Sequence, residues 1–303
     1  MLGVSECLLG GEVRYDGKSA ANDNVIHLLG ATFGFLPFCP EAGIGGTTPR
    51  PPMDLVRRNG VIQAVVRDNG GEVITARLRK YSLQAVEDMA GVCGFVLKSR
   101  SPSCALTDAK VSGGAGLRRA AGLFASILAK KTYIPLVDER RLEKPGEMES
   151  FMERALLCGH WIKRGLRSSG RERLMEFHES VWLLAACRGR KGLAEWRSLS
   201  LALRRNLSPG NYFLRLMDAL SAPSGRKARA FGLRRMAQVL AKSHGKSEGA
   251  AIAHVRRYSA GEETFEQALS GILDAAEGKG TTGQLYMDFH PGGLKDGAKL
   301  SRT

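Results

Sequence analysis

The sequence predicts an α/β domain with an open, mostly parallel sheet and a small β-ribbon, followed by an all-α domain. Short apolar runs alternate with helix-like segments up to about residue 160, which is the pattern of an α/β sheet. From about residue 165 the segments have helical spacing and few β-branched runs. The length of 303 residues exceeds that of a usual single domain, so we expect two domains.

We expect residues 1–164 to form the α/β domain, residues 165–290 the helical domain and residues 291–303 a disordered tail, which has no apolar stripe. Net charge separates the two halves. Residues 1–160 contain 20 Lys and Arg against 17 Asp and Glu, whereas residues 161–303 contain 25 against 13. The second half therefore indicates either an anionic partner or a solvated basic face.

Four short apolar runs predict the strands of the main sheet. These runs are residues 2–5, 33–38, 92–97 and 133–137. A short helix is expected at residues 20–30, where Val25, Ile26, Leu28 and Leu29 recur, so the first two strands form a βαβ-like unit.

Asn59-Gly60 predicts the β-ribbon, because this dipeptide favours a two-residue hairpin turn between residues 53–58 and 61–66. The segment before it, residues 43–52, is too rich in Gly and Pro for regular structure. A helix is expected at residues 74–90. The glycine-rich residues 112–116 are expected to precede a helix at residues 117–131. Backbone N–H groups of such a loop can bind an anion. The indication is weak here, because no phosphate-loop lysine accompanies the glycines.

The remaining periodic segments predict helices. They are residues 147–164, 171–187, 193–207, 211–221, 226–243, 246–258 and 263–276.

Three cysteines follow predicted strands, which places them at one edge of a parallel sheet. Cys7, Cys39 and Cys104 each lie among Gly, Pro and Ser residues, and a shared metal site is favoured over three isolated thiols. Thiolates select zinc or an iron–sulfur cluster, and the sequence has none of the paired cysteines that structural zinc often uses. Cys93, Cys158 and Cys187 lie inside predicted elements, so we expect buried apolar side chains there.

Six cysteines are too few for a disulfide scaffold. We expect no signal-type leader before Cys7 and no membrane span, because the chain has no run of about 18 apolar residues. A reducing, cytoplasmic location follows as an expectation.

Six segments of the first half together resemble the thiouracil desulfidase family. They are Ser5-Glu6-Cys7-Leu8-Leu9-Gly10, Arg14-Tyr15-Asp16-Gly17, Cys39-Pro40-Glu41, Pro49-Arg50, Lys98-Ser99-Arg100-Ser101-Pro102-Ser103-Cys104 and Asp138-Glu139-Arg140-Arg141-Leu142. The resemblance spans roughly residues 1–160. This chain departs from the family at Glu6, where a small residue is usual, and at Ala105, where glycine is usual.

The resemblance implies a [4Fe-4S] cluster held by Cys7, Cys39 and Cys104, which serve as both cofactor and metal ligands. It also implies a fourth iron that takes the sulfur removed from a thiolated nucleobase. The family's catalytic glutamate and serine match Glu41 and Ser101. From the residues alone, a salt bridge to Arg50 is the favoured role of Glu41, and a cap on the turn before Pro102 is the favoured role of Ser101.

Four charged residues beside the expected crevice are candidates for holding the pyrimidine's polar edge: Arg14, Asp16, Arg50 and Lys98. The alternative, that they brace the loops as ion pairs, ranks slightly higher. A carboxylate at Glu6 would lower the reduction potential of a thiolate-bound cluster.

The second half resembles the YbgA-like helical domain through Phe177-His178, Asn211-Tyr212-Phe213 and Gln284-Leu285-Tyr286. Pairs of basic residues on its helices suit phosphate contacts. These pairs are Arg204-Arg205, Arg226-Lys227, Arg234-Arg235 and Arg256-Arg257. The alternatives to an enzyme acting on a small thiolated base are therefore a protein that binds thiolated RNA and a non-catalytic, zinc-stapled protein.

Overall fold

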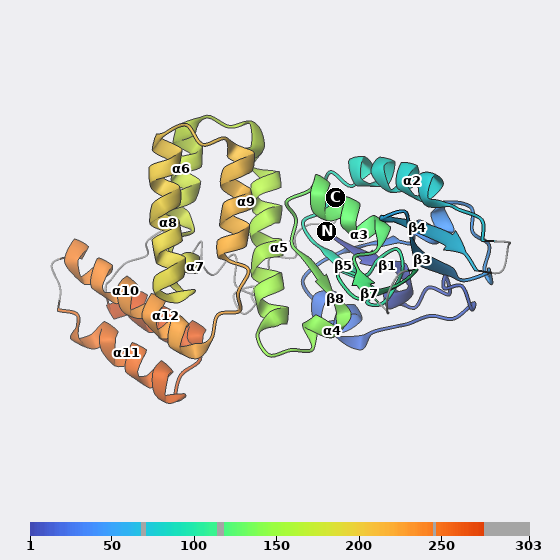
Figure 1. Cartoon of the computed structure of the whole chain (residues 1–303). Helices are drawn as coiled ribbons and strands as arrows, with labels where there is room; N and C mark the ends of the chain where they lie inside the picture. Colours follow the sequence, from blue (N-terminus) through green and yellow to red (C-terminus); the bar gives the residue numbers. More distant parts are fainter. Residues whose placement is uncertain (68–70, 114–117, 245–246, 276–303) are drawn as a thin grey trace. The chain divides into compact units, whose positions relative to one another are not determined.

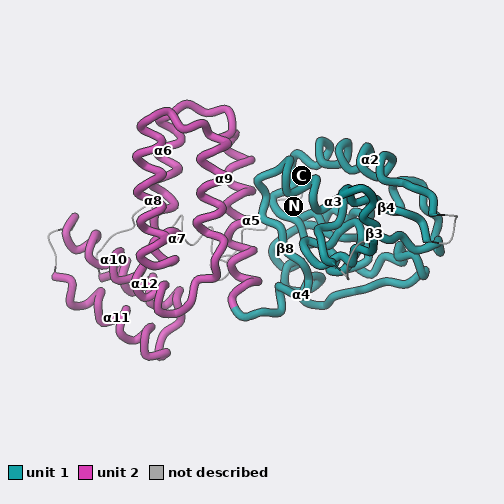
Figure 2. The backbone as a smooth tube through the Cα atoms, viewed as in Figure 1, with its two compact units in different colours: residues 1–145, 302 teal, residues 146–301, 303 magenta. Residues whose placement is uncertain are grey.

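The computed structural model describes residues 1–67, 71–113, 118–244 and 247–275. These residues form two compact units, one of Met1–Pro145 and one that begins at Gly146 (Figure 2). Helix α5 (Glu147–Lys163) groups with the later helices. The sequence placed the change of domain after residue 164, because that helix directly continues the α/β alternation.

The main sheet of the first unit contains four strands in the order β2-β1-β5-β8. They are β1 (Leu2–Ser5), β2 (Phe35–Phe38), β5 (Phe95–Leu97) and β8 (Leu136–Asp138). All three pairings are parallel, as the sequence predicts. The carboxyl ends of the strands therefore share one edge.

A second sheet has the order β4-β3-β6-β7. The predicted hairpin is confirmed as β3 (Met53–Arg58) and β4 (Val61–Val66), and both turn residues, Asn59 and Gly60, have positive φ, as the twist-matched hairpin turn requires. The ribbon continues through β6 (Ala109–Ser112), parallel to β3, and β7 (Arg118–Ala120), antiparallel to β6. The predicted ribbon, β3 and β4, thus supplies two of the four strands of the second sheet.

The predicted start of a helix at residue 117 is wrong. Helix α3 (Leu123–Lys131) begins six residues later, because residues 118–120 extend as β7 and pair with β6. Alternating burial along Ala109, Lys110, Val111 and Ser112 is the period-2 pattern that signals β6. Residues 114–117 lie outside the described part, and the described residues that follow them form β7 and not the start of a helix.

The remaining elements of the first unit are short, apart from α2. They are η1 (Glu6–Leu9), η2 (Asn24–Leu29), α1 (Pro40–Gly43), α2 (Thr75–Asp88) and α4 (Glu139–Leu142). Figure 1 shows α2 next to β4 and α4 next to β8. Phe38, Phe95 and Phe124 form an aromatic contact, with ring centroids of Phe38 and Phe124 4.7 Å apart, so α3 is packed on the main sheet.

The described part of the second unit contains helices and no strands, as predicted. After α5 these are η3 (Leu166–Ser168), α6 (Arg171–Ser180), α7 (Trp182–Ala186), α8 (Gly189–Arg204), α9 (Pro209–Ala219), α10 (Arg226–His244), α11 (Gly249–Ala260) and α12 (Phe265–Ala275). The predicted helix 171–187 is interrupted at Val181. No helix in the described residues has the length and apolar character needed to cross a membrane.

The aromatic core of the second unit contains the residues that resemble the YbgA-like domain. Trp161 stacks on Phe213 with centroids 4.4 Å apart, and Phe177 and Tyr212 are fully buried beside them. His178 stacks on Trp196 at 4.6 Å, and its Nδ1 lies 3.3 Å from the Tyr212 hydroxyl. The residues Phe177-His178 and Tyr212-Phe213 thus pack in the core of the second unit. Gln284-Leu285-Tyr286 and the predicted disordered tail lie outside the described residues.

We predict that acid weakens the second unit through His178. Burial lowers the pKa of His178 from 6.5 to about 4, so between these values the unfolded chain binds a proton that the folded unit does not. The contribution of His178 to the free energy of unfolding should fall by up to about 3 kcal/mol as pH decreases from 6.5 to 4. His160, whose pKa burial also lowers to about 4, adds to this loss. All three tryptophans, Trp161, Trp182 and Trp196, lie in this unit, so denaturant titrations followed by tryptophan fluorescence measure it.

In His178→Gln the same titrations should show a smaller loss of stability on acidification. A loss as steep as in the wild type would assign the acid sensitivity to other groups.

Candidate functional site

The candidate site is a cavity of about 540 Å³ at the carboxyl edge of the main sheet. The segments that follow β1, β2 and β5 supply one wall, and residues of β3 supply another. Cys7, Cys39 and Cys104 all line this cavity. The structure thus brings together the three cysteines that the sequence singled out, although 97 residues separate the first from the last.

Local backbone structure fixes each of these cysteines. Cys7 lies in η1, directly after β1, and Cys39 is the N-cap of α1, where its carbonyl accepts the Gly43 N–H at 3.0 Å. Cys104 lies in the turn after β5, where its N–H donates to the Ser101 hydroxyl at 3.1 Å. Each thiol is therefore held by a backbone turn at a strand end.

Burial raises the pKa of all three thiols. The pKa of Cys7 rises to about 11, with Cys39 adding to the increase and the Lys98 and Arg14 cations opposing it. Burial raises the pKa values of Cys39 and Cys104 as well. The sulfurs of Cys39 and Cys7 raise the pKa of Cys104 further through charge repulsion. The three thiols are therefore close enough to interact, and a bound metal would have to displace their protons.

No disulfide involves any of the six cysteines. Cys93, Cys158 and Cys187 are at most 3% exposed, as predicted for small apolar side chains. Among the described residues, no group of three or more His, Cys, Asp and Glu side chains is arranged to hold a metal ion.

Glu41 lies on α1, two residues after Cys39, and lines the cavity. Its Oε2 pairs with Arg50 at 3.1 Å, which is the pairing the sequence raised as an alternative, and its Oε1 accepts the Ser103 hydroxyl at 2.9 Å. Ser103 is completely buried. Two donors therefore fix the carboxylate, and each oxygen keeps a lone pair for a further donor.

Ser101 also lines the cavity. Its hydroxyl oxygen accepts the N–H groups of Ser103 and Cys104 at 3.2 and 3.1 Å, so Ser101 is a cap, on the turn that contains Pro102 and not on one before it. Both bonds use the oxygen as acceptor. The hydroxyl proton is therefore available to donate to a molecule in the cavity.

The four charged candidates all form ion pairs. Arg14 pairs with Asp16 at 3.2 Å, Arg50 with Glu41, and Lys98 with Glu139. Asp16 lies outside the cavity lining, whereas Arg14, Arg50 and Lys98 belong to it. This geometry agrees with bracing of the loops, the interpretation ranked higher from the sequence.

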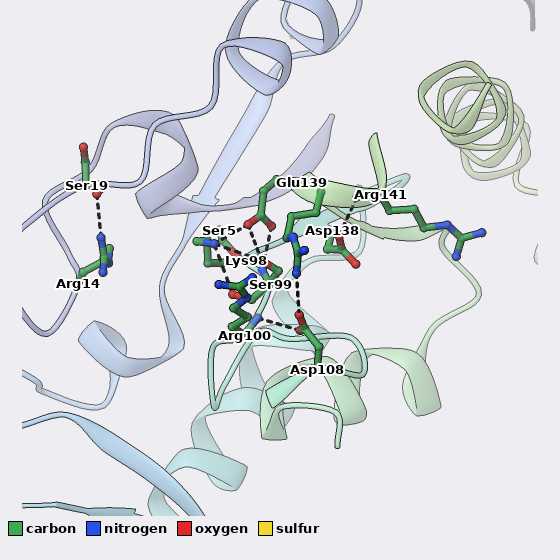
Figure 3. Close-up of polar contacts among 11 residues, drawn as sticks. Ser5, Arg14, Ser19, Lys98, Ser99, Arg100, Asp108, Asp138, Glu139 and Arg141 are labelled. Atoms are coloured by element: carbon green, nitrogen blue, oxygen red, sulfur yellow. Dashed lines mark hydrogen bonds and ion pairs between the residues drawn. The ribbon is translucent and has the colours of Figure 1, made fainter. Parts of the chain in front are cut away.

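Glu139 is a residue that the sequence analysis did not place in the site. It is 6% exposed and accepts the backbone N–H of Ser99 at 2.8 Å, the Ser99 hydroxyl at 2.6 Å and the Lys98 ammonium. Figure 3 shows these groups converging from the ends of β5 and β8. One buried carboxylate thus joins two neighbouring strand ends.

The two departures from the family pattern have different surroundings. Ala105 is fully buried in the apolar core beside the second sheet, and its φ is not positive, so glycine is not required there. Glu6 lines the cavity, and its side chain lies against Gly11, where an added Cβ would be 2.7 Å from Glu6 Cγ.

Comparisons with known proteins concern this first unit. A family model described as 2-thiouracil desulfurase matches residues 2–140. A solved structure described as "[4Fe-4S]-dependent thiouracil desulfidase TudS" is 31% identical in sequence, covers 46% of this chain and 91% of its own, and superposes with a TM-score of 0.39. The chain belongs to the 2-thiouracil desulfurase family. The identity over nearly all of that relative, together with the family model, decides this membership.

This family consists of enzymes, and residues 2–140 carry the membership. A protein of Bacillus subtilis (strain 168) described as "Uncharacterized protein YbbK" is 29% identical over 113 residues, which are 34% of this chain and 72% of that protein. The predicted thiouracil desulfidase resemblance of the first half is thus confirmed. The helical unit lies outside the matched residues, so its resemblance to the YbgA-like domain stays a prediction.

We predict that Glu139→Ala destabilises the first unit by about 2–3 kcal/mol, because it leaves the buried backbone N–H and hydroxyl of Ser99 without their acceptor. The neighbouring Asp138→Ala is the matched control: Asp138 caps α4 through the Arg141 N–H at 2.8 Å, and such a cap contributes about 1 kcal/mol. Denaturant titration followed by far-ultraviolet circular dichroism compares the two. Equal losses would show that the buried network does not stabilise this edge.

Proposed function

We propose that this chain removes sulfur from a thiolated, thiouracil-like pyrimidine base in a non-redox reaction. A [4Fe-4S] cluster bound by Cys7, Cys39 and Cys104 would assist the reaction. The observation that carries the proposal is that three thiols, Glu41 and Ser101 line one cavity at the carboxyl edge of the sheet. Membership of the desulfurase family supports the reaction, and the [4Fe-4S] dependence of the solved relative supports the cofactor.

The donor set fits such a cluster. Thiolates are the ligands that iron–sulfur clusters prefer. In a cubic cluster each cysteine binds a different iron, so ligands spaced around a cavity suit it. Cys7, Cys39 and Cys104 would leave one iron of such a cluster without a protein ligand, and the cluster would supply Lewis-acid chemistry for a thiocarbonyl sulfur at that position.

The protein's own groups would then handle water and protons. Replacing a thiocarbonyl by a carbonyl consumes one water and releases one hydrogen sulfide, which carries away the two protons of that water. Glu41 would take the first proton from the attacking water and pass it on to the departing sulfide. Arg50 and Ser103 hold the carboxylate in one orientation. Ser101, with its oxygen occupied by two N–H groups, is placed to donate its proton to the water or the base.

We predict that replacing Cys7, Cys39 or Cys104 by serine abolishes the brown colour and most bound iron of the anaerobically reconstituted full chain. Cys93→Ser, Cys158→Ser and Cys187→Ser should keep both, because these thiols lie away from the cavity lining. Iron analysis and visible absorbance measure the effect.

A colourless wild-type protein that binds zinc would support the non-catalytic alternative. Iron loss in Cys93→Ser but not in Cys39→Ser would refute the assignment of ligands.

We predict that Glu41→Gln keeps the cluster but lowers sulfide release about 10²–10⁴-fold, since it removes the base without removing a ligand. Ser101→Ala should show a smaller loss. Glu87→Gln on the exposed face of α2 is the control and should turn over normally. Unchanged turnover in Glu41→Gln would exclude it as the base.

Exposed basic residues at one end of the helical unit favour a second candidate, in which the thiolated base belongs to RNA. The basic pairs expected to contact phosphate differ in the structure: Arg226, Arg235 and Arg257 hydrogen-bond within the unit, whereas Arg204 and Arg205 are exposed at the end of α8.

The turn that joins α5 to α6 lies at the same end of the helices as the turn that joins α8 to α9 (Figure 1), and η3 contacts both α5 and α9. The turn from α5 to α6 and the helix ends next to it contain further exposed basic residues: Lys163, Arg164, Arg167, Arg171 and Arg173. These residues, together with Arg204 and Arg205, form what we name the basic end. A polyanion is the partner that such a surface fits.

We predict that a variant with Arg164, Arg167, Arg204 and Arg205 changed to Gln binds RNA more weakly and with a shallower salt dependence. Each lost phosphate contact reduces the slope of log affinity against log salt by about 0.7 to 0.9. The charge-matched control changes Arg190, Lys191, Arg234 and Arg256, which are also exposed. Equal behaviour of the two variants, or no binding at low salt, would refute a role for the basic end.

A further inference from the structure

Tyr15 is an exposed aromatic residue in the lining of the cavity. It is 44% exposed and lines the cavity together with the three thiols. Its sequence neighbours Arg14 and Asp16 are candidates for holding the substrate, whereas the tyrosine itself has no role so far. Packing inside the protein does not account for a ring this exposed, and a ligand in the cavity can bury apolar surface against it.

Phe38 is the other aromatic residue of the lining, and the core uses its ring. That ring packs against Phe124 and Phe95, with centroids 4.7 and 6.4 Å away. The Tyr15 ring instead contacts the guanidinium of Arg14, whose carbon lies 5.9 Å from the ring centroid. A cation interacts with the face of a ring, so Arg14 occupies one side and the other side is left for a planar ligand.

Hydrogen bonds fix Tyr15 and the cation beside it. The Arg14 carbonyl accepts the Gly17 N–H at 3.0 Å, which closes a four-residue turn with Tyr15 at its second position. The Tyr15 carbonyl accepts the Arg50 N–H at 2.9 Å, so the turn is joined to another residue of the lining. The Arg14 guanidinium is held by Asp16 at 3.2 Å. A residue fixed in this way loses little conformational freedom when a ligand binds, which favours affinity.

We propose that Tyr15 is the aromatic platform on which the pyrimidine ring of the substrate stacks. This inference rests on the proposed function, since it takes the ligand to be a thiolated pyrimidine. Stacking on an aromatic side chain suits every base because each base has a π-face. The cavity volume of about 540 Å³ lies within the range of small-molecule sites, so a single-ring base has room there.

The experiment measures, by calorimetry, how the anaerobically reconstituted full chain binds uracil, the product that thiouracil desulfuration leaves. Tyr15→Leu should weaken uracil binding about 10-fold. The same variant should raise KM for 2-thiouracil by a similar factor with little change in kcat, because stacking holds the base equally before and during the reaction. Tyr15→Phe keeps the ring and should bind uracil like the wild type.

The matched control is Tyr133→Leu. Tyr133 is a tyrosine of the same unit and is 39% exposed, but it lies outside the cavity lining. This variant should also bind uracil like the wild type.

Equal uracil binding by Tyr15→Leu and the wild type, or none by the wild type, would overturn the inference. A loss in Tyr15→Phe as large as that in Tyr15→Leu would overturn it as well, because the hydroxyl and not the ring would then be the binding group. Sulfide release with an unchanged KM in Tyr15→Leu would refute the platform alone. A wild-type chain that binds uracil through Tyr15 but releases no sulfide from 2-thiouracil would support the platform and refute the proposed function.

Discussion

The parallel pairing of β1 with both β2 and β5 is the constraint on which the site depends. This pairing aligns three strand ends along one edge. A cysteine follows the end of each strand: Cys7 after β1, Cys39 after β2 and Cys104 after β5. β1 and β5 are buried along their whole length, so close packing holds the ends of these strands in place. Three thiols that are far apart in the sequence can therefore share one cavity with little help from the loops that carry them.

Buried polar side chains then hold the strand ends together. Ser5 joins β1 to the start of the Lys98 loop, Glu139 joins that loop to the end of β8, and Ser103 joins the Cys104 turn to Glu41 on α1. A fully satisfied network in a low-dielectric site rigidifies its surroundings. The protein's own side chains thus preorganise the edge that lines the cavity.

The sequence predicted the features that local pattern encodes. Apolar runs predicted the four parallel strands, and Asn59-Gly60 predicted the hairpin. The positions of Cys7, Cys39 and Cys104 after predicted strands indicated that these residues meet at one edge of the sheet. It missed β6 and β7, because buried residues in β6 alternate with exposed ones and β7 has no buried residue, so neither strand forms an apolar run. It also missed Ser5, Ser103 and Glu139. A buried serine or glutamate has no signature in one sequence, since its role comes from partners far along the chain: 62 residues separate Ser103 from Glu41, and 93 separate Ser5 from Lys98.

The central claim is that Cys7, Cys39 and Cys104 surround one metal centre, and anomalous diffraction at the iron edge tests it most directly. Crystals of the anaerobically reconstituted full chain should show one compact group of iron atoms in the cavity, in contact with these three sulfurs and with no fourth cysteine. Iron bound elsewhere, or a single zinc ion in its place, would contradict the account.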